Sequence, residues 1–348
     1  MEEPVGEVLS VSIIVPVKNS ARTVRDLMES LMRLDYDRDK LEIIVVDGKS
    51  SDGTRKIVSE YPVLLVDEEG KGLNAARNTG IKWSAGQILA YTDGDCVVPP
   101  GWAKSIAKNF RDPSVSFVGG PVEGYDQGNF ISTYMDETFF PAKPGFRWRR
   151  EATQLSLLNF PAGCNMAFRR QALEKINYFD ERINHGFDDL DPVEKLGSRG
   201  FKIVLDPEVT VYHQHRTSLK EMLKQHFNYG RGGTLLIIAK RASKLARWFT
   251  TYLISSTFVL TVLILLFTAG FILNRMRPIH LGLNFIVFSI ALLMTLYLET
   301  AFRTGSLRKL ILYPILDIAR GIFFTLGGIT KLFKELGRKT PPESLKRL

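Results

Sequence analysis

The sequence predicts an α/β protein with a mainly parallel sheet covered by helices on both faces, followed by apolar C-terminal helices. Through the first two-thirds of the chain, short apolar stretches alternate with segments whose apolar side chains recur at helical spacing. Alternating strands and helices connect through right-handed crossovers, which make neighbouring strands parallel. The last third is largely hydrophobic and contains stretches of the length that spans a bilayer.

The expected strands are short and apolar, and a helical pattern separates most of them. We expect strands at residues 12–17, 41–46, 62–66, 87–92 and 115–118. We expect helices at residues 24–32, 54–60, 74–83 and 102–110. A mainly parallel sheet is normally buried on both faces, so helices should cover both of its sides. This first domain is expected to occupy residues 1–232.

Residues 233–348 are expected to form a membrane region. Residues 249–273 contain no charged side chain and exceed the roughly 20 residues needed to cross a bilayer. Residues 279–298 form a second apolar stretch, and the short connection between the two stretches predicts a helical hairpin.

A third apolar stretch covers residues 310–329 but contains Pro314, Asp317 and Arg320. Asp317 and Arg320 are three residues apart, so they could pair on one face of a helix. If this stretch crossed the membrane, the basic tail at residues 331–347 would lie on the far side, against the positive-inside tendency. The stretch therefore either crosses despite this bias or lies in the membrane interface.

The charge distribution indicates a membrane surface, and not nucleic acid, as the partner of the basic residues. The chain has 46 Lys and Arg against 37 Asp and Glu, a net charge of +9. Many basic side chains flank the apolar stretches and suit anionic headgroups on the cytoplasmic side, and no nucleic-acid motif is recognisable. The first residues do not resemble a signal peptide. We expect a multi-pass protein of the cell membrane whose first domain is cytoplasmic.

The most informative segment is residues 87–95, an apolar run that ends in Asp93 and Asp95 with one glycine between them. Open α/β sheets bind ligands at the carboxyl ends of their strands. Burying two unpaired carboxylates there is too costly, but a divalent cation would satisfy both, and Mg²⁺ is commonly held by carboxylates and substrate phosphates. The alternative is a surface turn, because Asp-Gly is a common turn dipeptide.

A further carboxylate, Asp47, ends the second expected strand. It could accept a hydrogen bond from a ring N–H of uracil or guanine, or it could only cap the turn that follows. A glycine-bounded stretch at residues 70–80 brings Lys71 and Arg77 close to a backbone that a ligand could approach. The two cysteines, at positions 96 and 164, form neither a CxxC pair nor a zinc-ligand spacing, so we expect buried free thiols.

Four segments occur in order and at fitting intervals, namely residues 12–19, 46–54, 76–80 and 93–95. Together they resemble the family 2 glycosyltransferases, which have a GT-A fold, and the resemblance covers about residues 10–232. Two positions depart from the family pattern. Val17 stands where the family often has an aromatic residue, and an acidic residue often follows the position of Asn19.

The resemblance assigns the nucleobase pocket to residues near two strand ends and to a basic residue nearby, namely Pro16, Val17, Asp47 and Arg77. It also implies that Asp93 and Asp95 form the DXD element, which holds the donor's ribose and a metal ion on its diphosphate.

Downstream, residues 161–170 resemble the family's strand beneath the sugar and the acceptor. Asp188 and Asp189 fall on the family's Glu-Asp pair, and Asp189 matches its catalytic base. A carboxylate there can take the proton from an acceptor hydroxyl, and crowded carboxylates raise the pKa of at least one of them. Without the resemblance, the acidic pair would read as a solvated loop.

Two histidines alternate in a short expected strand at residues 210–215, so the side chains of His213 and His215 share one face. Imidazole is a common metal ligand, and in similar enzymes a histidine at a strand end completes the metal site. We assign His213 to that role, together with Asp93 and Asp95, and expect Mg²⁺ or Mn²⁺. His215 is expected to be a helper or merely structural.

These features predict a metal-dependent, inverting glycosyltransferase that uses a UDP- or GDP-sugar. The acceptor would be a hydroxyl of a lipid-linked molecule or of a growing polysaccharide at the cytoplasmic membrane face. Three alternatives stay open. The acceptor could be a polyprenyl phosphate, the chain could be an inactive nucleotide-sugar-binding subunit, or it could be a nucleotidyltransferase.

Overall fold

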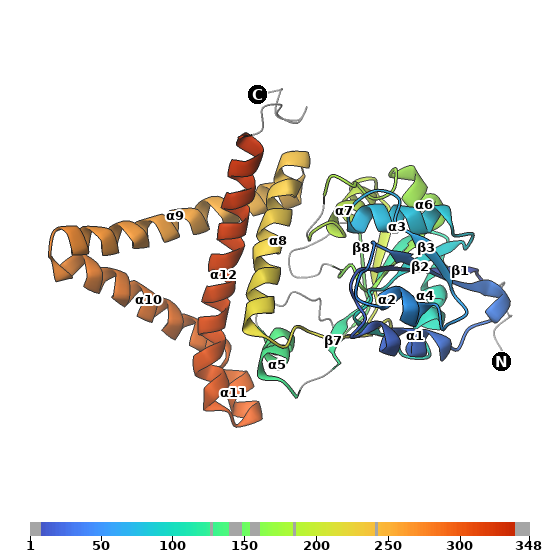
Figure 1. The fold of residues 1–348 in the computed structure, drawn as a ribbon, viewed down its shortest axis with the longest axis horizontal. Coiled ribbons are helices and arrows are strands. Elements are labelled where there is room, and N and C mark those ends of the chain that lie inside the picture. The colour runs from blue at the N-terminus through green and yellow to red at the C-terminus, as the bar shows by residue number, and fades with distance from the viewer. Residues whose placement is uncertain are drawn as a thin grey trace. The chain divides into compact units, whose positions relative to one another are not determined.

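The computed structural model describes residues 8–125, 128–138, 148–153, 161–183, 186–240 and 243–337. The chain forms two compact units. The first unit contains residues 1–136 and 142–215, and the second contains residues 137–141 and 216–348. The first is an α/β domain and the second is built of long helices (Figure 1).

An eight-stranded sheet lies at the centre of the first unit, with its strands in the order β3-β2-β1-β4-β9-β6-β10-β8. The strands are β1 Val11–Val17, β2 Leu41–Asp47, β3 Leu64–Asp67, β4 Ile88–Tyr91, β6 Val115–Gly119, β8 Arg150–Ala152, β9 Met166–Arg169 and β10 Lys202–Leu205. The five strands expected from the sequence correspond to β1, β2, β3, β4 and β6, so the α/β class is confirmed.

The sheet is parallel on one side and mixed on the other. β3, β2, β1 and β4 are parallel, as short crossovers through helices predict. β9 runs antiparallel to both of its neighbours, β4 and β6, and β8 runs antiparallel to β10. A long connection that includes helix α5 (Phe130–Glu137) and β8 precedes β9, so no single crossover helix imposes the parallel direction there.

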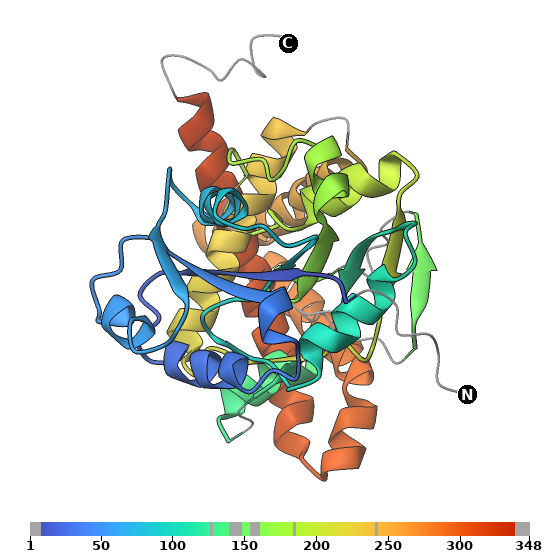
Figure 2. The same ribbon diagram turned by 90° about the vertical axis from the view of Figure 1, so that its right-hand side faces the viewer.

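Helices cover both faces of the sheet (Figure 2). Along β1, Ile13 and Val15 join one buried cluster and Ile14 joins the other, because alternate side chains of a strand point to opposite faces. The first cluster includes side chains of α1 (Val24–Met32), α2 (Thr54–Val58) and α4 (Trp102–Phe110). The second includes side chains of α3 (Leu73–Lys82), α6 (Arg170–Lys175) and α7 (Leu190–Ser198).

A second sheet of three short strands joins distant parts of the first unit. Its order is β5-β11-β7, with β5 at Cys96–Val97, β11 at Val211–His213 and β7 at Val122–Gly124. β11 is antiparallel to β5 and parallel to β7. This sheet places the end of β11 beside the residues that follow β4.

The second unit consists of α8 (Leu219–Ala239), α9 (Lys244–Ile272), α10 (Met276–Leu296), α11 (Leu298–Thr304) and α12 (Leu307–Leu336). By length and composition, α9, α10 and α12 could each cross a membrane. α9 and α10 pack together as the expected hairpin. The predicted boundary at residue 232 falls inside α8, which belongs to the second unit, and residues 338–347 of the basic tail lie outside the described residues.

α8 and α12 are in direct backbone contact, because glycines face each other along their length. A Cβ on Gly230 would lie 1.8 Å from the carbonyl oxygen of Phe324, and a Cβ on Gly327 would lie 1.9 Å from that of Phe227. Small residues allow helices to approach this closely in membrane proteins. Any side chain at these two positions would force the helices apart.

The charged residues of α12 are not isolated. Arg320 Nη1 lies 3.3 Å from Asp317 Oδ1, so the pair expected from their spacing is present. Arg320 also donates to His226 Nε2 at 2.8 Å and to Thr138 Oγ1 at 2.9 Å, and Tyr297 donates to Asp317. Buried polar groups need such partners, and this network joins α12 to α8, to Tyr297, which directly precedes α11, and to Thr138.

Candidate active site

Asp47 lies at the carboxyl end of β2, opposite Val17 at the end of β1. Its side chain is fully buried, and Oδ2 accepts hydrogen bonds from the Ser50 N–H at 3.0 Å and from Arg55 Nη1 at 3.2 Å. Among the residues that the structure describes, none donates to Oδ1. A buried acceptor without a donor is costly, and a ring N–H of a base would supply one. Asp47 therefore caps its turn and still keeps one acceptor for a ligand.

The loops after β1 and β2 hold each other in place. Asn19 Oδ1 accepts a hydrogen bond from the Ser51 N–H at 2.9 Å, and the Asn19 N–H donates to Ser50 Oγ at 2.9 Å. Pro16 and Val17, the two residues assigned to the base pocket, are buried in β1 just before this loop. These hydrogen bonds connect the ends of β1 and β2, where the nucleotide is expected to bind.

The acidic turn at residues 93–95 follows β4 and packs against the end of β1. Gly94 has little room for a side chain, because a Cβ there would lie 2.9 Å from Ser20 Oγ and 3.1 Å from Val17 Cγ1. The Gly94 carbonyl accepts a hydrogen bond from Thr23 Oγ1 at 2.7 Å. The glycine between the two aspartates thus lets the turn lie next to the strand end of the base pocket.

His213 lies beside Asp95, as the metal assignment requires. Asp95 Oδ1 is 3.3 Å from His213 Nε2, and the backbone N–H of Gln214 donates to the Asp95 carbonyl at 2.8 Å. Ligand atoms of Asp95, Cys96 and His213 lie within 4.8 Å of one another, and Asp93 stands outside this group of described residues. Carboxylate and imidazole donors fit a divalent ion, so the residues present suit a metal.

The electrostatics of this corner also suit a cation. Burial raises the pKa of Asp93 to about 6, although Arg77 opposes the rise. Burial lowers the pKa of His213, but the carboxylate of Asp95 outweighs burial and the net effect raises this pKa to about 9. In the absence of a metal, a protonated His213 would supply the positive charge that the two aspartates require. A divalent ion would replace that proton.

His215 supports His213 from the side away from Asp95. The two Nδ1 atoms are 3.1 Å apart, and His215 Nε2 is 3.7 Å from Asp136 Oδ1. A histidine that ligates a metal usually donates its other ring N–H to a partner that fixes its orientation. His215 is thus placed where it could orient the His213 ring, and its role as a helper or as a structural residue stays a prediction.

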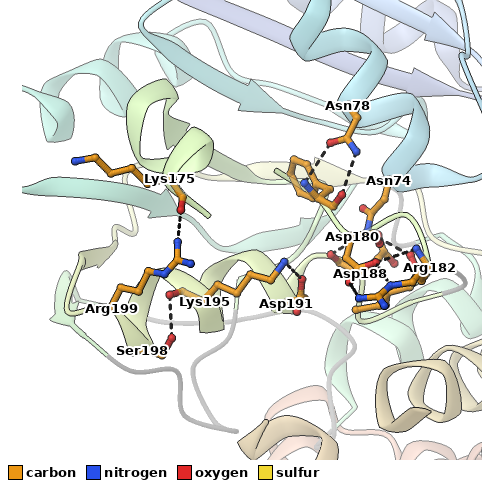
Figure 3. Close-up of polar contacts among 12 residues, drawn as sticks. Asn74, Asn78, Lys175, Asp180, Arg182, Asp188, Asp191, Lys195, Ser198 and Arg199 are labelled. Carbon is orange, nitrogen blue, oxygen red and sulfur yellow. Dashed lines mark hydrogen bonds and ion pairs between the residues drawn. The ribbon is translucent and has the colours of Figure 1, made fainter. Parts of the chain in front are cut away.

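Arg77 and Asp188 form a buried ion pair next to the second acidic site. Arg77 is 1% exposed and Asp188 is 3% exposed, and Nη1 of Arg77 donates to Asp188 Oδ2 and, at 3.0 Å, to Asn74 Oδ1. Figure 3 shows Asn74 and Asn78 of α3 facing the loop that carries Asp188. Asn74 Nδ2 donates to the Asp180 carbonyl at 3.0 Å, which anchors that loop. The ion pair and the Asn74 hydrogen bond therefore connect α3 to this site.

Asp189 immediately precedes α7 and lies against Gly163. A Cβ on Gly163 would be 3.0 Å from Asp189 Oδ2 and 2.6 Å from Arg77 Nη2, and the Gly163 N–H bonds to the Asp189 carboxylate. Burial raises the pKa of Asp189 to about 7; the charge of Asp188 adds to the rise and Arg77 opposes it. A carboxyl group with a pKa near neutrality can accept a proton and release it again at physiological pH.

The acidic pair is therefore not a solvated loop, which was the alternative reading of residues 188–189. Arg77 was expected near the base pocket, but the structure places it against Asp188, and the arginine that contacts Asp47 is Arg55. Arg55 also pairs with Asp67 at the end of β3.

Three residues of the site are not predicted from the sequence, namely Arg55, Cys96 and Gly163. Arg55 carries no motif of its own, and Cys96 is brought to the metal corner only by strand pairing. Gly163 was noted only as part of the segment beneath the sugar, and its contact with Asp189 depends on a fold that joins residues far apart in the chain. The sequence signal for this contact is Gly163 itself, which directly precedes Cys164 in the segment at residues 161–170.

Comparison with known proteins identifies the class of this site. Residues 12–177 match the model of the family described as glycosyl transferase family 2. The chain is 28% identical over 250 residues to the glycosyltransferase AglE of Haloferax volcanii, which covers 68% of this chain and 79% of that protein. It is 28% identical over 235 residues to the pre-mycofactocin glycosyltransferase of Mycobacterium tuberculosis, covering 66% of this chain and 47% of that longer protein.

A solved structure shares the fold. The mannosyltransferase PcManGT from Pyrobaculum calidifontis, in complex with GDP-Man and Mn²⁺, aligns with a TM-score of 0.56 and 19% identity, over 94% of this chain and 88% of that one. The strand order and the acidic turn after β4 are consistent with the family match and with the fold of this solved structure. Residues 12–177 match glycosyl transferase family 2, and the fold is a GT-A fold followed by helices long and apolar enough to span a membrane.

Proposed function

We propose that this glycosyltransferase moves a sugar, with inversion, from a UDP- or GDP-sugar to a hydroxyl of a lipid-linked or growing polysaccharide acceptor at the cytoplasmic membrane face. The observation that carries the proposal is Asp189. Its carboxyl group has a pKa of about 7 and is held beside the buried Arg77–Asp188 pair at the start of α7. This is the placement and the protonation behaviour that a general base needs.

The donor's base would lie against Pro16 and Val17, with its ring N–H on Asp47 Oδ1. Support comes from the buried Oδ1 atom, which has no donor among the described residues. Uracil and guanine both offer such an N–H, so this contact accepts either base. Val17 in place of an aromatic side chain provides contact area but no stacking ring.

Asp93, Asp95 and His213 would hold Mg²⁺ or Mn²⁺, which supplies positive charge to the departing diphosphate when it is bound. The 3.3 Å approach of Asp95 to His213 supports this assignment. Asp93 lies outside the tight group and is the residue expected to reach the ribose as well. Mn²⁺ occurs with GDP-Man in the P. calidifontis structure, which makes it a natural ion to test.

Asp189 would take the proton of the acceptor hydroxyl while the hydroxyl oxygen bonds to the anomeric carbon. The bond from that carbon to the diphosphate oxygen breaks, and the nucleoside diphosphate leaves from the opposite face. Arg77 donates to the Asp188 carboxylate and so occupies it, whereas Asp189, with its pKa of about 7, is the member of the pair that would accept the proton near neutral pH. Both carboxylates therefore matter, but only Asp189 accepts the proton.

The helices α9, α10 and α12 would keep the domain at the membrane and near its acceptor. Their length and composition support membrane association. We propose that the α/β domain lies on the cytoplasmic side, because the basic residues near the apolar helices suit that leaflet.

A donor screen tests the proposal. The purified full-length protein is mixed with membrane lipid extract, Mn²⁺ and single UDP- or GDP-sugars, GDP-mannose included, and nucleoside diphosphate release is measured. We expect one donor to give release that Asp189→Asn abolishes and that Asp39→Asn, an exposed carboxylate control, leaves intact.

Other outcomes identify the alternatives. Full turnover by Asp189→Asn indicates a polyprenyl phosphate acceptor, which is already anionic and needs no base. Donor binding without any release indicates an inactive subunit. Base label appearing in the product indicates a nucleotidyltransferase.

A further inference from the structure

The proposed reaction leaves two buried thiols unused near the proposed metal site. Cys96 and Cys164 are hydrogen-bonded to each other, and among the described residues it is Cys96 that groups with Asp95 and His213. Cys96 is fully buried in β5. Antiparallel pairing places it directly opposite His213 of β11, and Asp95 precedes it in the chain. Directly opposite residues of an antiparallel pair point to the same face and lie close together. The ligand atoms of Asp95, Cys96 and His213 accordingly lie within 4.8 Å of one another.

These three side chains offer one oxygen, one sulfur and one nitrogen, a mixture that separates metals by softness. Zn²⁺ is held at tetrahedral sites by cysteine, histidine and carboxylate ligands. Mg²⁺ prefers oxygen ligands, and Mn²⁺ binds such a mixed set more weakly than Zn²⁺ does. Mg²⁺ or Mn²⁺ would therefore be ligated by the aspartate oxygens and not by the thiol. Zn²⁺ would also be ligated by the Cys96 sulfur.

We propose that Asp95, Cys96 and His213 form a second, thiophilic ligand set for Zn²⁺, which shares two residues with the catalytic metal site and excludes the catalytic ion. When Zn²⁺ binds, Cys96 loses its thiol proton to solvent, because only the thiolate ligates the metal. The ion is then bound to protein ligands in place of the donor's diphosphate. Zinc thus inhibits the transferase by competing with Mg²⁺ or Mn²⁺. This inhibitory part rests on the proposed function, whereas the metal site itself does not.

The direct test uses Co²⁺ as a spectroscopic substitute for Zn²⁺ on the full-length protein in detergent. A cobalt–thiolate bond gives a charge-transfer absorption band in the near ultraviolet, which oxygen and nitrogen ligands do not give. The chain has only two cysteines, and Cys164 hydrogen-bonds to Cys96, so Cys164→Ser is the variant that separates the contributions of the two thiols. We expect the band in the wild type and in Cys164→Ser, its absence in Cys96→Ser, and its loss when Zn²⁺ displaces Co²⁺.

Zinc affinity, measured by titration calorimetry with Zn²⁺ alone, should fall at least about tenfold in Cys96→Ser, since loss of even an outer partner of a metal ligand costs roughly that much. Absence of the band in the wild type overturns the proposal without any variant. A band that persists in Cys96→Ser, or that disappears only in Cys164→Ser, overturns the assignment to Cys96.

Kinetics test the inhibitory part. Each variant's Zn²⁺ inhibition is measured against its own Mn²⁺-supported activity, and we expect the inhibiting concentration to rise with added Mn²⁺ and to rise at least tenfold in Cys96→Ser. Zinc inhibition that Mn²⁺ does not relieve contradicts the shared site. The cobalt band does not depend on turnover. An inactive protein with the band refutes the proposed function alone, and an active protein without the band refutes this inference alone.

Discussion

Replacing each aspartate of the acidic pair by asparagine should have opposite effects on stability. The unfolded chain releases the Asp189 proton near its ordinary pKa of 3.8, and the folded protein releases it near pH 7. The free energy of unfolding therefore falls as the pH rises between these values. By linkage, the raised pKa of Asp189 costs the folded state about 4 kcal/mol at pH 8 and about 2 kcal/mol at pH 5.

Asp189→Asn removes that cost and should stabilise the protein, by roughly 2 to 3 kcal/mol more at pH 8 than at pH 5. For a domain of this size, this difference corresponds to roughly 5 to 10 °C in the unfolding temperature. Asp188→Asn should do the reverse, because it leaves the buried guanidinium of Arg77 without its partner, a loss that typically costs about 3 to 5 kcal/mol.

The two variants should also differ in catalysis. Asp189→Asn should lower kcat by roughly 10²- to 10⁴-fold, the usual contribution of a general base. In the wild type, kcat/KM should rise with pH through about 7, as Asp189 loses its proton. In Asp188→Asn, this rising limb should move to lower pH, because the charge of Asp188 raises the pKa of Asp189.

The assays are thermal unfolding at pH 5 and pH 8 and a pH profile of kcat/KM for all three proteins. A stabilisation by Asp189→Asn that is equal at both pH values would refute the raised pKa. A pH profile unchanged in Asp188→Asn would refute the coupling between the two carboxylates.

Three further predictions concern other parts of the molecule. Asp47→Asn should raise the KM for the donor by roughly 10- to 100-fold with little change in kcat, as expected when a buried acceptor of a ligand N–H is lost; an unchanged donor KM would contradict the base pocket. His213→Gln should raise the Mn²⁺ concentration needed for half-maximal activity at least about tenfold, and titration calorimetry with Mn²⁺ alone should show the same loss; unaltered Mn²⁺ affinity would contradict the ligand role. Gly327→Val should lower the unfolding temperature, because its Cβ would lie 1.9 Å from the Phe227 carbonyl oxygen, whereas Gly337→Val, where the nearest atom is 3.4 Å away, should have a smaller effect; equal effects would contradict the close contact of α8 with α12.

The parts of the site that the sequence predicts are those at strand ends in the parallel half of the sheet. Asp47 and the turn at residues 93–95 end neighbouring or nearby strands that point the same way, so any such sheet brings them to one edge. Burial and hydrogen bonding then follow from their positions. The positions of Asp47 and of the turn at residues 93–95 can therefore be predicted from the strands alone, without knowing how the loops pack.

The remaining contacts depend on pairings that no local pattern records. Arg77 and Asp188 are 111 residues apart, and α3 meets the loop before α7 only once the whole sheet has formed. Cys96 and His213 meet because two strands of two and three residues pair antiparallel, and strands this short show no periodicity. The direction of β9 is likewise set by the long connection before it.

The boundary between the units shows a similar limit. The sequence predicts a boundary at residue 232, beside the glycines at positions 230, 232 and 233. In the structure all three glycines lie inside α8, and Gly230 allows close contact with α12. Glycine permits loops and close helix packing alike, so composition could not separate the two.

We propose that a metal-assisted sugar transfer occurs at the edge of the sheet formed by the carboxyl ends of β1, β2 and β4. The most direct measurement supplies the purified protein with the donor that the screen selects, labelled separately in the sugar and in the base, together with membrane lipid extract. With Mn²⁺ present, we expect sugar label in the lipid or polysaccharide fraction, base label only in released nucleoside diphosphate, and neither after chelation. Sugar transfer that persists with the metal removed, or base label in the acceptor fraction, would contradict it.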